Sequence, residues 1–89
     1  MIKVLLVDDQ YLIRQGLRAL LELEPDLEIV GEAENGREAI DLIAQLHPDV
    51  VLMDMRMPVM DGVGAQREIQ QRFSNTKTLV LTTFDDTEY

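Results

Sequence analysis

Three short apolar runs that stop at polar residues constrain the fold of this chain more than any other feature. They cover residues 2–7, 49–53 and 79–81 and consist mainly of Val, Leu and Ile. Runs of this length and composition are typical of strands buried on both faces of a parallel sheet. A fourth segment, residues 27–33, alternates more and carries two glutamates. This pattern is typical of a partly exposed edge strand.

Segments with helical periodicity separate these runs. Residues 10–24 place apolar side chains at the spacing of one helix face, and Pro25 closes the segment. We expect the apolar face to pack on the sheet and the polar face to meet water. The two faces consist of Leu12, Ile13, Leu17, Leu20 and Leu21, and of Arg14, Gln15, Arg18 and Glu22. Residues 39–46, after an Asn-Gly turn, and more weakly residues 63–73 repeat the pattern. Alternating strands and helices predict an α/β fold with a parallel sheet and helices on both faces.

Composition excludes several classes of function. Eight basic residues against seventeen acidic ones give a net charge of −9, so the chain lacks the clustered Lys and Arg that unspecific nucleic-acid binding needs. With no cysteine and one histidine, disulfides, thiolate catalysis and Cys-ligated zinc are excluded, and oxygen is the expected ligand for any metal. The N-terminal apolar run is neither a signal peptide nor a membrane span. We expect a cytoplasmic protein whose partners here are neither DNA nor a membrane.

The polar residues that end the apolar runs indicate where chemistry could occur. Ligands of open parallel sheets bind beyond the carboxyl ends of the strands, where the strand order reverses. If the first and third runs are neighbouring strands, five polar residues meet at that edge, namely Asp8, Asp9, Asp54, Thr82 and Thr83. Two carboxylates about 4 Å apart repel by about 4 kcal/mol at an effective dielectric of about 20, a cost that a divalent cation removes. Mg²⁺ fits because it prefers oxygen ligands and retains water.

One carboxylate of this set could act as a nucleophile toward a phosphoryl group, with a threonine hydroxyl and backbone N–H groups holding the transferred oxygens. Glu32 ends the edge segment and is expected on the far side, away from this crevice. Taken singly, the same residues also have structural interpretations. Asp8 or Asp54 can form a turn or cap a helix, and Thr82 can simply be a β-former at a strand end. His47 is interpreted as a structural residue at a helix end.

Three motifs together resemble the receiver domain of two-component response regulators. They are the pair Asp8-Asp9, the stretch Asp-Met-Arg-Met-Pro-Val-Met-Asp-Gly that begins at Asp54, and Leu-Thr-Thr-Phe-Asp-Asp, which begins at Leu81. Residues 30–36, Val-Gly-Glu-Ala-Glu-Asn-Gly, are similar to the NarL/FixJ group. The resemblance covers the whole chain. It implies a flavodoxin-like (CheY-like) doubly wound parallel sheet with the strand order 2-1-3-4.

The resemblance also implies roles for the acidic residues. Asp54 would accept a phosphoryl group from a sensor histidine kinase. Asp9, Asp54 and the backbone carbonyl of Arg56 would hold Mg²⁺, and Asp8 would assist, mainly through water. As a receiver, the domain would not be an enzyme, because it takes phosphate onto its own aspartate and at most loses it again by itself.

For the phosphoryl oxygens, the resemblance assigns the hydroxyl of Thr82 as the switch group and the backbone N–H groups of Arg56 and Thr83 as a cradle. Members of the family also carry a lysine after a fifth strand, whereas the only lysines here are Lys3 and Lys77. We therefore interpret the whole chain, residues 1–89, as one receiver domain truncated before its fifth β/α unit. The DNA-binding helix-turn-helix of the group is absent, and we expect slower phosphate uptake than in an extended domain.

Truncation at this point predicts self-association and leaves two other functions open. The unpaired edge at residues 78–83 is expected to form a dimer or larger homo-oligomer, either edge to edge or by exchange of the C-terminal segment around residues 55–62. A phosphatase of the haloacid dehalogenase type would also use an aspartyl nucleophile with Mg²⁺. That family needs a second Asp two residues later, where this chain has Arg56. The remaining alternative is a receiver-like interaction module with an idle acidic pocket.

Overall fold

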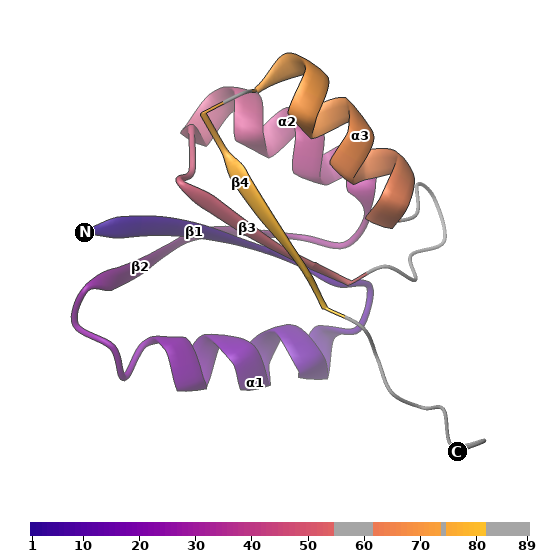
Figure 1. The fold of residues 1–89 in the computed structure, drawn as a ribbon. Helices are drawn as coiled ribbons and strands as arrows, with labels where there is room; N and C mark the ends of the chain where they lie inside the picture. Colours follow the sequence, from indigo (N-terminus) through magenta and orange to yellow (C-terminus); the bar gives the residue numbers. More distant parts are fainter. Residues whose placement is uncertain (55–61, 74, 82–89) are drawn as a thin grey trace.

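Strands and helices alternate along the chain as the sequence predicts (Figure 1). The computed structural model describes residues 1–54, 62–73 and 75–81. The strands are β1 (Ile2–Val7), β2 (Leu27–Ala33), β3 (Val50–Asp54) and β4 (Lys77–Leu81), and the helices are α1 (Tyr11–Leu21), α2 (Gly36–Leu46) and α3 (Gly62–Arg72). Within these described ranges, no helix has the length and apolar character needed to cross a membrane.

All four strands are parallel and follow the order β2-β1-β3-β4, which confirms the predicted order 2-1-3-4. β2, the segment with two glutamates, lies at one edge as expected. The strands also end close together, because Val7 pairs with both Ala33 and Met53, and Asp54 pairs with Leu81. The carboxyl ends of β1 and β3 therefore lie side by side.

An irregularity in the ladder between β1 and β2 changes the phase of β2. Val4 pairs with Ile29, but the next residue, Leu5, pairs with Gly31. β2 thus contains one extra residue, Val30, which forms a β-bulge. Because side chains of a strand alternate between the two faces of the sheet, one extra residue exchanges the faces of all the residues that follow it.

The sheet face under α2 and α3 carries the main core. Figure 1 shows these two helices together on one side of the sheet and α1 alone on the other. The core joins apolar residues of β1, β2 and β3 to both helices. Its members are Leu5, Val7, Ala33, Ala39, Ile40, Ile43, Val51, Met53 and Ile69. Leu42 and Phe73 pack against this core and are partly buried. This face is closed by residues of the described chain itself.

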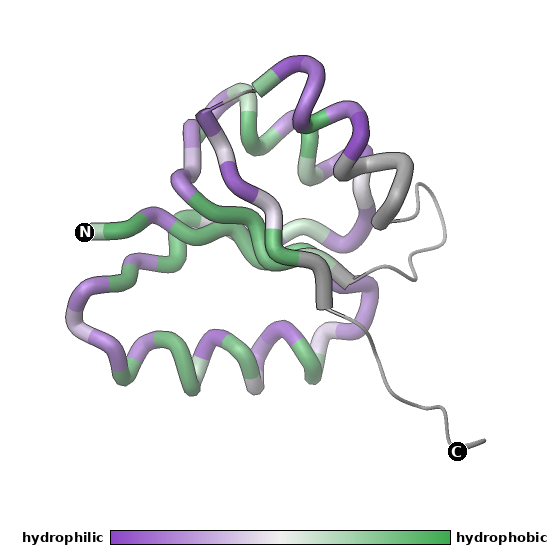
Figure 2. The backbone as a smooth tube through the Cα atoms, in the orientation of Figure 1, coloured by the Kyte–Doolittle hydropathy of each residue, from purple (hydrophilic) through white to green (hydrophobic). Residues whose placement is uncertain are grey.

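The packing of α1 differs in part from the prediction. Leu17 and Leu21 are half-buried, but Leu12 and Leu20 are 79% and 65% exposed, and Ile13 is also exposed. The residue that α1 buries is an arginine from the face expected to meet water. A carboxylate on β2 draws this arginine toward the sheet and so turns part of the apolar face outward. Apolar residues consequently recur along the exposed length of α1 (Figure 2).

The sheet face under α1 is only partly covered. α1 packs on β1 and β2, and an apolar hollow of about 210 Å³ remains on the sheet beside it. Its lining comes mainly from the strands and consists of Ile2, Val4, Leu21, Leu27, Val50, Leu52 and Leu79. Leu79 of β4 is 56% exposed. The two faces of one sheet are thus covered to different extents.

The two helices that follow β1 and β2 begin differently. At the start of α2, the Asn35 side chain accepts from the N–H of Glu38 at 2.9 Å, and the Glu38 carboxylate accepts from the N–H of Glu34 at 2.9 Å. The first bond caps the helix, and the second resembles that of a capping box but reaches the residue before the cap, so the expected Asn-Gly turn is the start of a helix. At the start of α1, Gln10 makes no side-chain capping bond. α1 also ends at Leu21, three residues earlier than expected, in a tight turn.

Candidate functional site

The acidic residues predicted to form a site begin where β1 and β3 end. Val7 pairs with Met53, so the next residues along the two strands, Asp8 and Asp54, follow at the same height. The backbone N–H of Asp8 also donates to the carbonyl of Ala33 at 3.0 Å, at the end of β2. The backbone thus brings the ends of three neighbouring strands together at one edge of the sheet, where a parallel sheet binds ligands.

The turn between β1 and α1 is held by its own side chains. Asp8 is only 4% exposed, and its Oδ1 accepts from the backbone N–H of Gln10 at 2.8 Å. The carbonyl oxygen of Asp8 accepts from Nη1 of Arg14 at 2.6 Å. Asp9, between Asp8 and Gln10, is exposed. The turn therefore combines one buried carboxylate and one accessible carboxylate, both with the hard oxygen atoms that Mg²⁺ prefers.

Several predicted site residues lie outside the described part of the chain. The backbone of Asp54 is described but its side chain is not, and Arg56, Thr82 and Thr83 lie outside the described residues. Among the described residues, no three His, Cys, Asp or Glu side chains gather in a way that could hold a metal. The expected carboxylate set includes the side chain of Asp54, so the Mg²⁺ site remains a prediction.

Sequence reasoning missed a cluster of ion pairs next to this turn. Glu32 on β2 accepts from Nε of Arg14 at 2.9 Å, from Nε of Arg18 at 2.8 Å and from the Gln15 amide at 3.1 Å. Arg18 also pairs with Glu22 at 3.0 Å. The three donors come from the face of α1 that was expected to meet water. That expectation was wrong for Arg14, which is buried.

These contacts shift the ionisation of the cluster. Burial raises the pKa of Glu32 and is the largest single influence, but the hydrogen bonds from Arg14, Arg18 and Gln15 together outweigh it. The pKa of the Glu32 carboxyl therefore lies below its ordinary value. The pKa of Arg18 is raised, chiefly by its hydrogen bond to Glu32. Both shifts favour the charged forms of Glu32 and Arg18.

Glu32 lies on the edge strand β2, across β1 from β3, as expected, but it is not isolated from the acidic turn. Glu32 pairs with Leu6 in the sheet and so lies one residue short of the strand ends. Its partner Arg14 continues to the carbonyl of Asp8, so one guanidinium connects Glu32 to the acidic turn. The sequence signal that could have found this link is the spacing of Arg14 and Arg18, which puts two guanidinium groups on one helix face.

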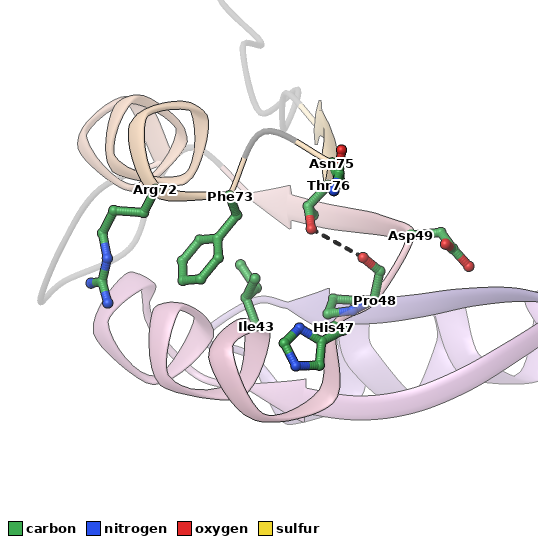
Figure 3. A pocket seen from close by; sticks show the side chains of 8 residues that line it. All are labelled: Ile43, His47, Pro48, Asp49, Arg72, Phe73, Asn75 and Thr76. Carbon is green, nitrogen blue, oxygen red and sulfur yellow. Dashed lines mark hydrogen bonds between the residues drawn. The ribbon is translucent and has the colours of Figure 1, made fainter.

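A cavity lies at the opposite end of the sheet, where β3 and β4 begin (Figure 3). It measures about 290 Å³ and is lined where α2 and α3 end, by Ile43, His47, Pro48, Asp49, Arg72, Phe73, Asn75 and Thr76. Two of its polar groups already bond to each other, since Oγ1 of Thr76 donates to the carbonyl of Pro48 at 3.1 Å. His47 is exposed and ends α2 with φ 50°, in keeping with a structural role at the helix end. The cavity is remote from the predicted acidic edge.

The sheet has the order β2-β1-β3-β4, and acidic residues follow β1 and end β3. Comparison with known sequences identifies the family that shares these features. The chain belongs to the response regulator receiver domain family, which it matches over residues 4–89. Transcriptional regulatory protein LiaR of Bacillus subtilis (strain 168) is 49% identical over 86 residues, which cover 97% of this chain and 41% of LiaR. The chain thus spans well under half the length of this relative.

Solved structures share the fold. The signal receiver domain of the putative response regulator NarL from Mycobacterium tuberculosis matches with a TM-score of 0.86 at 33% identity, over 98% of this chain and 70% of that chain. The response regulator domain of Thermotoga maritima CheB matches with a TM-score of 0.88 at 32% identity, over 98% of this chain and 64% of that chain. The predicted CheY-like receiver fold and the assignment to two-component response regulators are confirmed, and the dehalogenase-type alternative is set aside.

Proposed function

We propose that this receiver domain takes a phosphoryl group onto the carboxylate of Asp54 from the phosphohistidine of a sensor histidine kinase. A carboxylate oxygen of Asp54 attacks phosphorus, the P–N bond breaks, and the histidine ring leaves with its electron pair. The observation that carries the proposal is the register of β1 and β3, which puts Asp54 beside the Asp8–Asp9 turn at the carboxyl edge of the sheet. The domain is the substrate of the kinase and turns over no substrate of its own.

We propose that Asp8, Asp9 and Asp54, with the backbone carbonyl of Arg56, hold Mg²⁺. Oxygen donors of this kind suit the ion, and the turn that carries Asp8 and Asp9 is fixed by hydrogen bonds. When bound, Mg²⁺ supplies positive charge that offsets the repulsion among the carboxylates and the incoming phosphoryl group. Asp8 orients water at this site, because its carboxylate is buried and already accepts a backbone N–H.

The remaining roles follow the family pattern. In this proposal the hydroxyl of Thr82 approaches the phosphoryl group, and the backbone N–H groups of Arg56 and Thr83 hold its oxygens. β4 pairs with β3 as far as Leu81 and Asp54, which supports placing the next residue, Thr82, at the same edge. Donors aimed at developing negative charge are the usual means of stabilising phosphoryl transfer.

Beyond this domain, we propose a cytoplasmic transcriptional regulator as the parent protein, with DNA bound through a part outside residues 1–89. Support comes from relatives such as LiaR, a transcriptional regulatory protein of which this chain matches 41%. The net charge of −9 argues against DNA binding by the receiver domain itself.

Phosphorylation can be tested with a small acyl phosphate and Mg²⁺, followed by intact-protein mass spectrometry. We expect a phosphoryl adduct on the wild-type chain, formed about 10²–10³-fold more slowly than on a domain extended through the family lysine. Asp54→Asn should abolish the adduct, and Asp41→Asn, which changes an exposed aspartate on α2, should leave it unchanged. An adduct that persists in Asp54→Asn would contradict the assignment.

We also propose that the 89-residue chain self-associates through the edge of β4 or the sheet face beside it. Leu79 is exposed, and the hollow that it lines is wholly apolar in character, which favours burial against a second copy. Light scattering coupled to size exclusion should show a mass that rises with concentration. A chain that stays monomeric at high micromolar concentration would contradict this part of the proposal.

A further inference from the structure

A buried arginine spans the gap between the edge strand and the acidic turn. Arg14 donates from Nη1 to the carbonyl of Asp8 at 2.6 Å and from Nε to Glu32 at 2.9 Å. It is 8% exposed, and its Cζ lies 5.7 Å from the ring centroid of Tyr11. Because the N–H groups of a guanidinium form a rigid planar fork, holding Glu32 also fixes the direction of the bond to Asp8.

We propose that Arg14 is a positioning residue that holds the Asp8–Asp9 turn in the geometry that binds Mg²⁺, with Glu32 as its anchor. The inference rests on the proposed function of the acidic edge. Arg14 fixes the backbone of Asp8 from one side, while the N–H of Gln10 fixes its carboxylate from the other. Partners of this kind behind a metal-binding residue set its orientation, and their loss weakens metal affinity.

Charge and geometry predict opposite results for the loss of Arg14. A positive charge close to a cation site opposes the binding of Mg²⁺, so removing the charge alone should tighten binding. Removing a positioning contact should instead weaken binding, because the turn must then be ordered when the ion arrives. Whether Mg²⁺ affinity rises or falls therefore separates the effect of charge from the effect of positioning.

The chain offers a matched control. Arg18 lies one turn further along α1, has the same charge and pairs with the same carboxylate of Glu32 at 2.8 Å. Arg18→Gln therefore removes a positive charge and the bonds to Glu32 and exposed Glu22. Arg14→Gln removes a positive charge, a bond to Glu32 and the bond to Asp8. Arg14→Lys keeps the charge but replaces the planar fork with a single ammonium group.

The experiment is a Mg²⁺ titration of the ¹⁵N-labelled chain, following the amide signals of residues 8–10. We expect Arg14→Gln to weaken Mg²⁺ binding about tenfold, Arg14→Lys to recover part of the loss, and Arg18→Gln to bind within about twofold of wild type. Without Mg²⁺, the amide of Gln10, which donates to Asp8, should exchange faster in Arg14→Gln than in Arg18→Gln. If Arg14→Gln does not fold, Glu32→Gln releases the anchor while keeping the guanidinium. Faster exchange of the Gln10 amide without Mg²⁺ is then the deciding result, because the lost negative charge would weaken Mg²⁺ binding by itself.

The outcomes separate this proposal from the one on which it rests. Unchanged or tighter Mg²⁺ binding by Arg14→Gln, with clear binding by wild type, would overturn the role of Arg14 alone. Equal weakening in Arg14→Gln and Arg18→Gln would also overturn it, because the bond to Asp8, which only Arg14 of the two makes, would then have no effect of its own. A wild-type chain whose residues 8 and 9 do not respond to Mg²⁺ would overturn the function proposed for the acidic edge, and this inference with it.

Discussion

The two faces of the sheet differ in how fully the described chain covers them. Under α2 and α3, apolar residues such as Ile43 and Ile69 are completely buried. Under α1, the strands leave an open apolar hollow, and the helix itself exposes Leu12 and Leu20. Both faces belong to the same four strands, so the difference comes from the helices. One face supplies most of the core packing, and the other combines ion pairs with uncovered apolar surface.

The difference also separates stability from function within one fold. The core under α2 and α3 is built from buried apolar residues, whose truncation is expensive. The face under α1 contains the cluster of Arg14, Arg18 and Glu32, which reaches the acidic turn. Mutations on the first face should therefore change mainly the free energy of unfolding. Mutations on the second should have smaller effects on stability.

The largest effect is expected from Ile43→Ala on α2. Ile43 is fully buried in the main core, and truncating such a residue costs about 2–5 kcal/mol of unfolding free energy. Leu20→Ala on α1 is the matched control and should change it by about 0.5 kcal/mol or less, because Leu20 is exposed. Urea denaturation followed by circular dichroism measures both. Equal losses in the two variants would contradict the difference between the faces.

A smaller effect is expected at the helix starts. Asn35→Ala removes the capping bond to the N–H of Glu38 and should lower the unfolding free energy by about 1 kcal/mol. Gln10→Ala at the start of α1 removes no side-chain capping bond and should leave it nearly unchanged. The same denaturation experiment applies. A larger loss in Gln10→Ala would show that the start of α1 is held by its side chain after all.

The pH dependence of stability should depend on Glu32. Its pKa is lower in the folded domain than in the unfolded chain, so its stabilisation is present above the unfolded pKa of about 4.3 and is lost as pH falls through the folded pKa. Glu32→Gln should flatten the fall in unfolding free energy below about pH 5, by less than about 1 kcal/mol. Exposed Glu28, on the same strand, provides the control Glu28→Gln. If the unfolding free energy of wild type and Glu32→Gln fell in the same way below about pH 5, the lowered pKa of Glu32 would be contradicted.

The smallest effect on stability is expected from Leu79→Thr on the open face. Leu79 is largely exposed, so the unfolding free energy should change by about 0.5 kcal/mol or less. Threonine keeps the β preference of the strand while reducing the apolar surface of the hollow. At a dilution where the chain is monomeric, binding of a fluorescent dye specific for apolar surface should fall. Unchanged dye binding, or a large loss of stability, would show that the hollow is covered in solution.

Most of the fold could be predicted from the sequence, because buried strands and their order leave strong patterns. The runs at β1 and β3 are apolar on both faces and stop at Asp8 and Asp54, which predicts both the sheet and its acidic edge. The side chains expected at that edge from Arg56, Thr82 and Thr83 remain predictions.

The orientation of α1 could not be predicted in the same way. Its outward stripe contains Leu12 and Leu20, whereas its inward stripe contains Arg14 and Arg18, and both stripes have helical spacing. Hydrophobicity favours the first stripe. The second packs inward because Glu32, far away in sequence, provides a carboxylate at the right place. A contact between distant segments leaves no periodic signal, so Arg14 was read as a residue of the solvent face.

The extra residue in β2 decides which face of the sheet each of the last residues of this strand points to. Counting from Ile29, which pairs with Val4, the bulge at Val30 is the step that turns Glu32 toward α1 and its arginines. If the same residues formed a regular strand without the bulge, this carboxylate would point into the apolar layer beneath α2 and Ala33 would turn outward. A single bulge residue therefore sets the faces on which the side chains at the end of β2 lie.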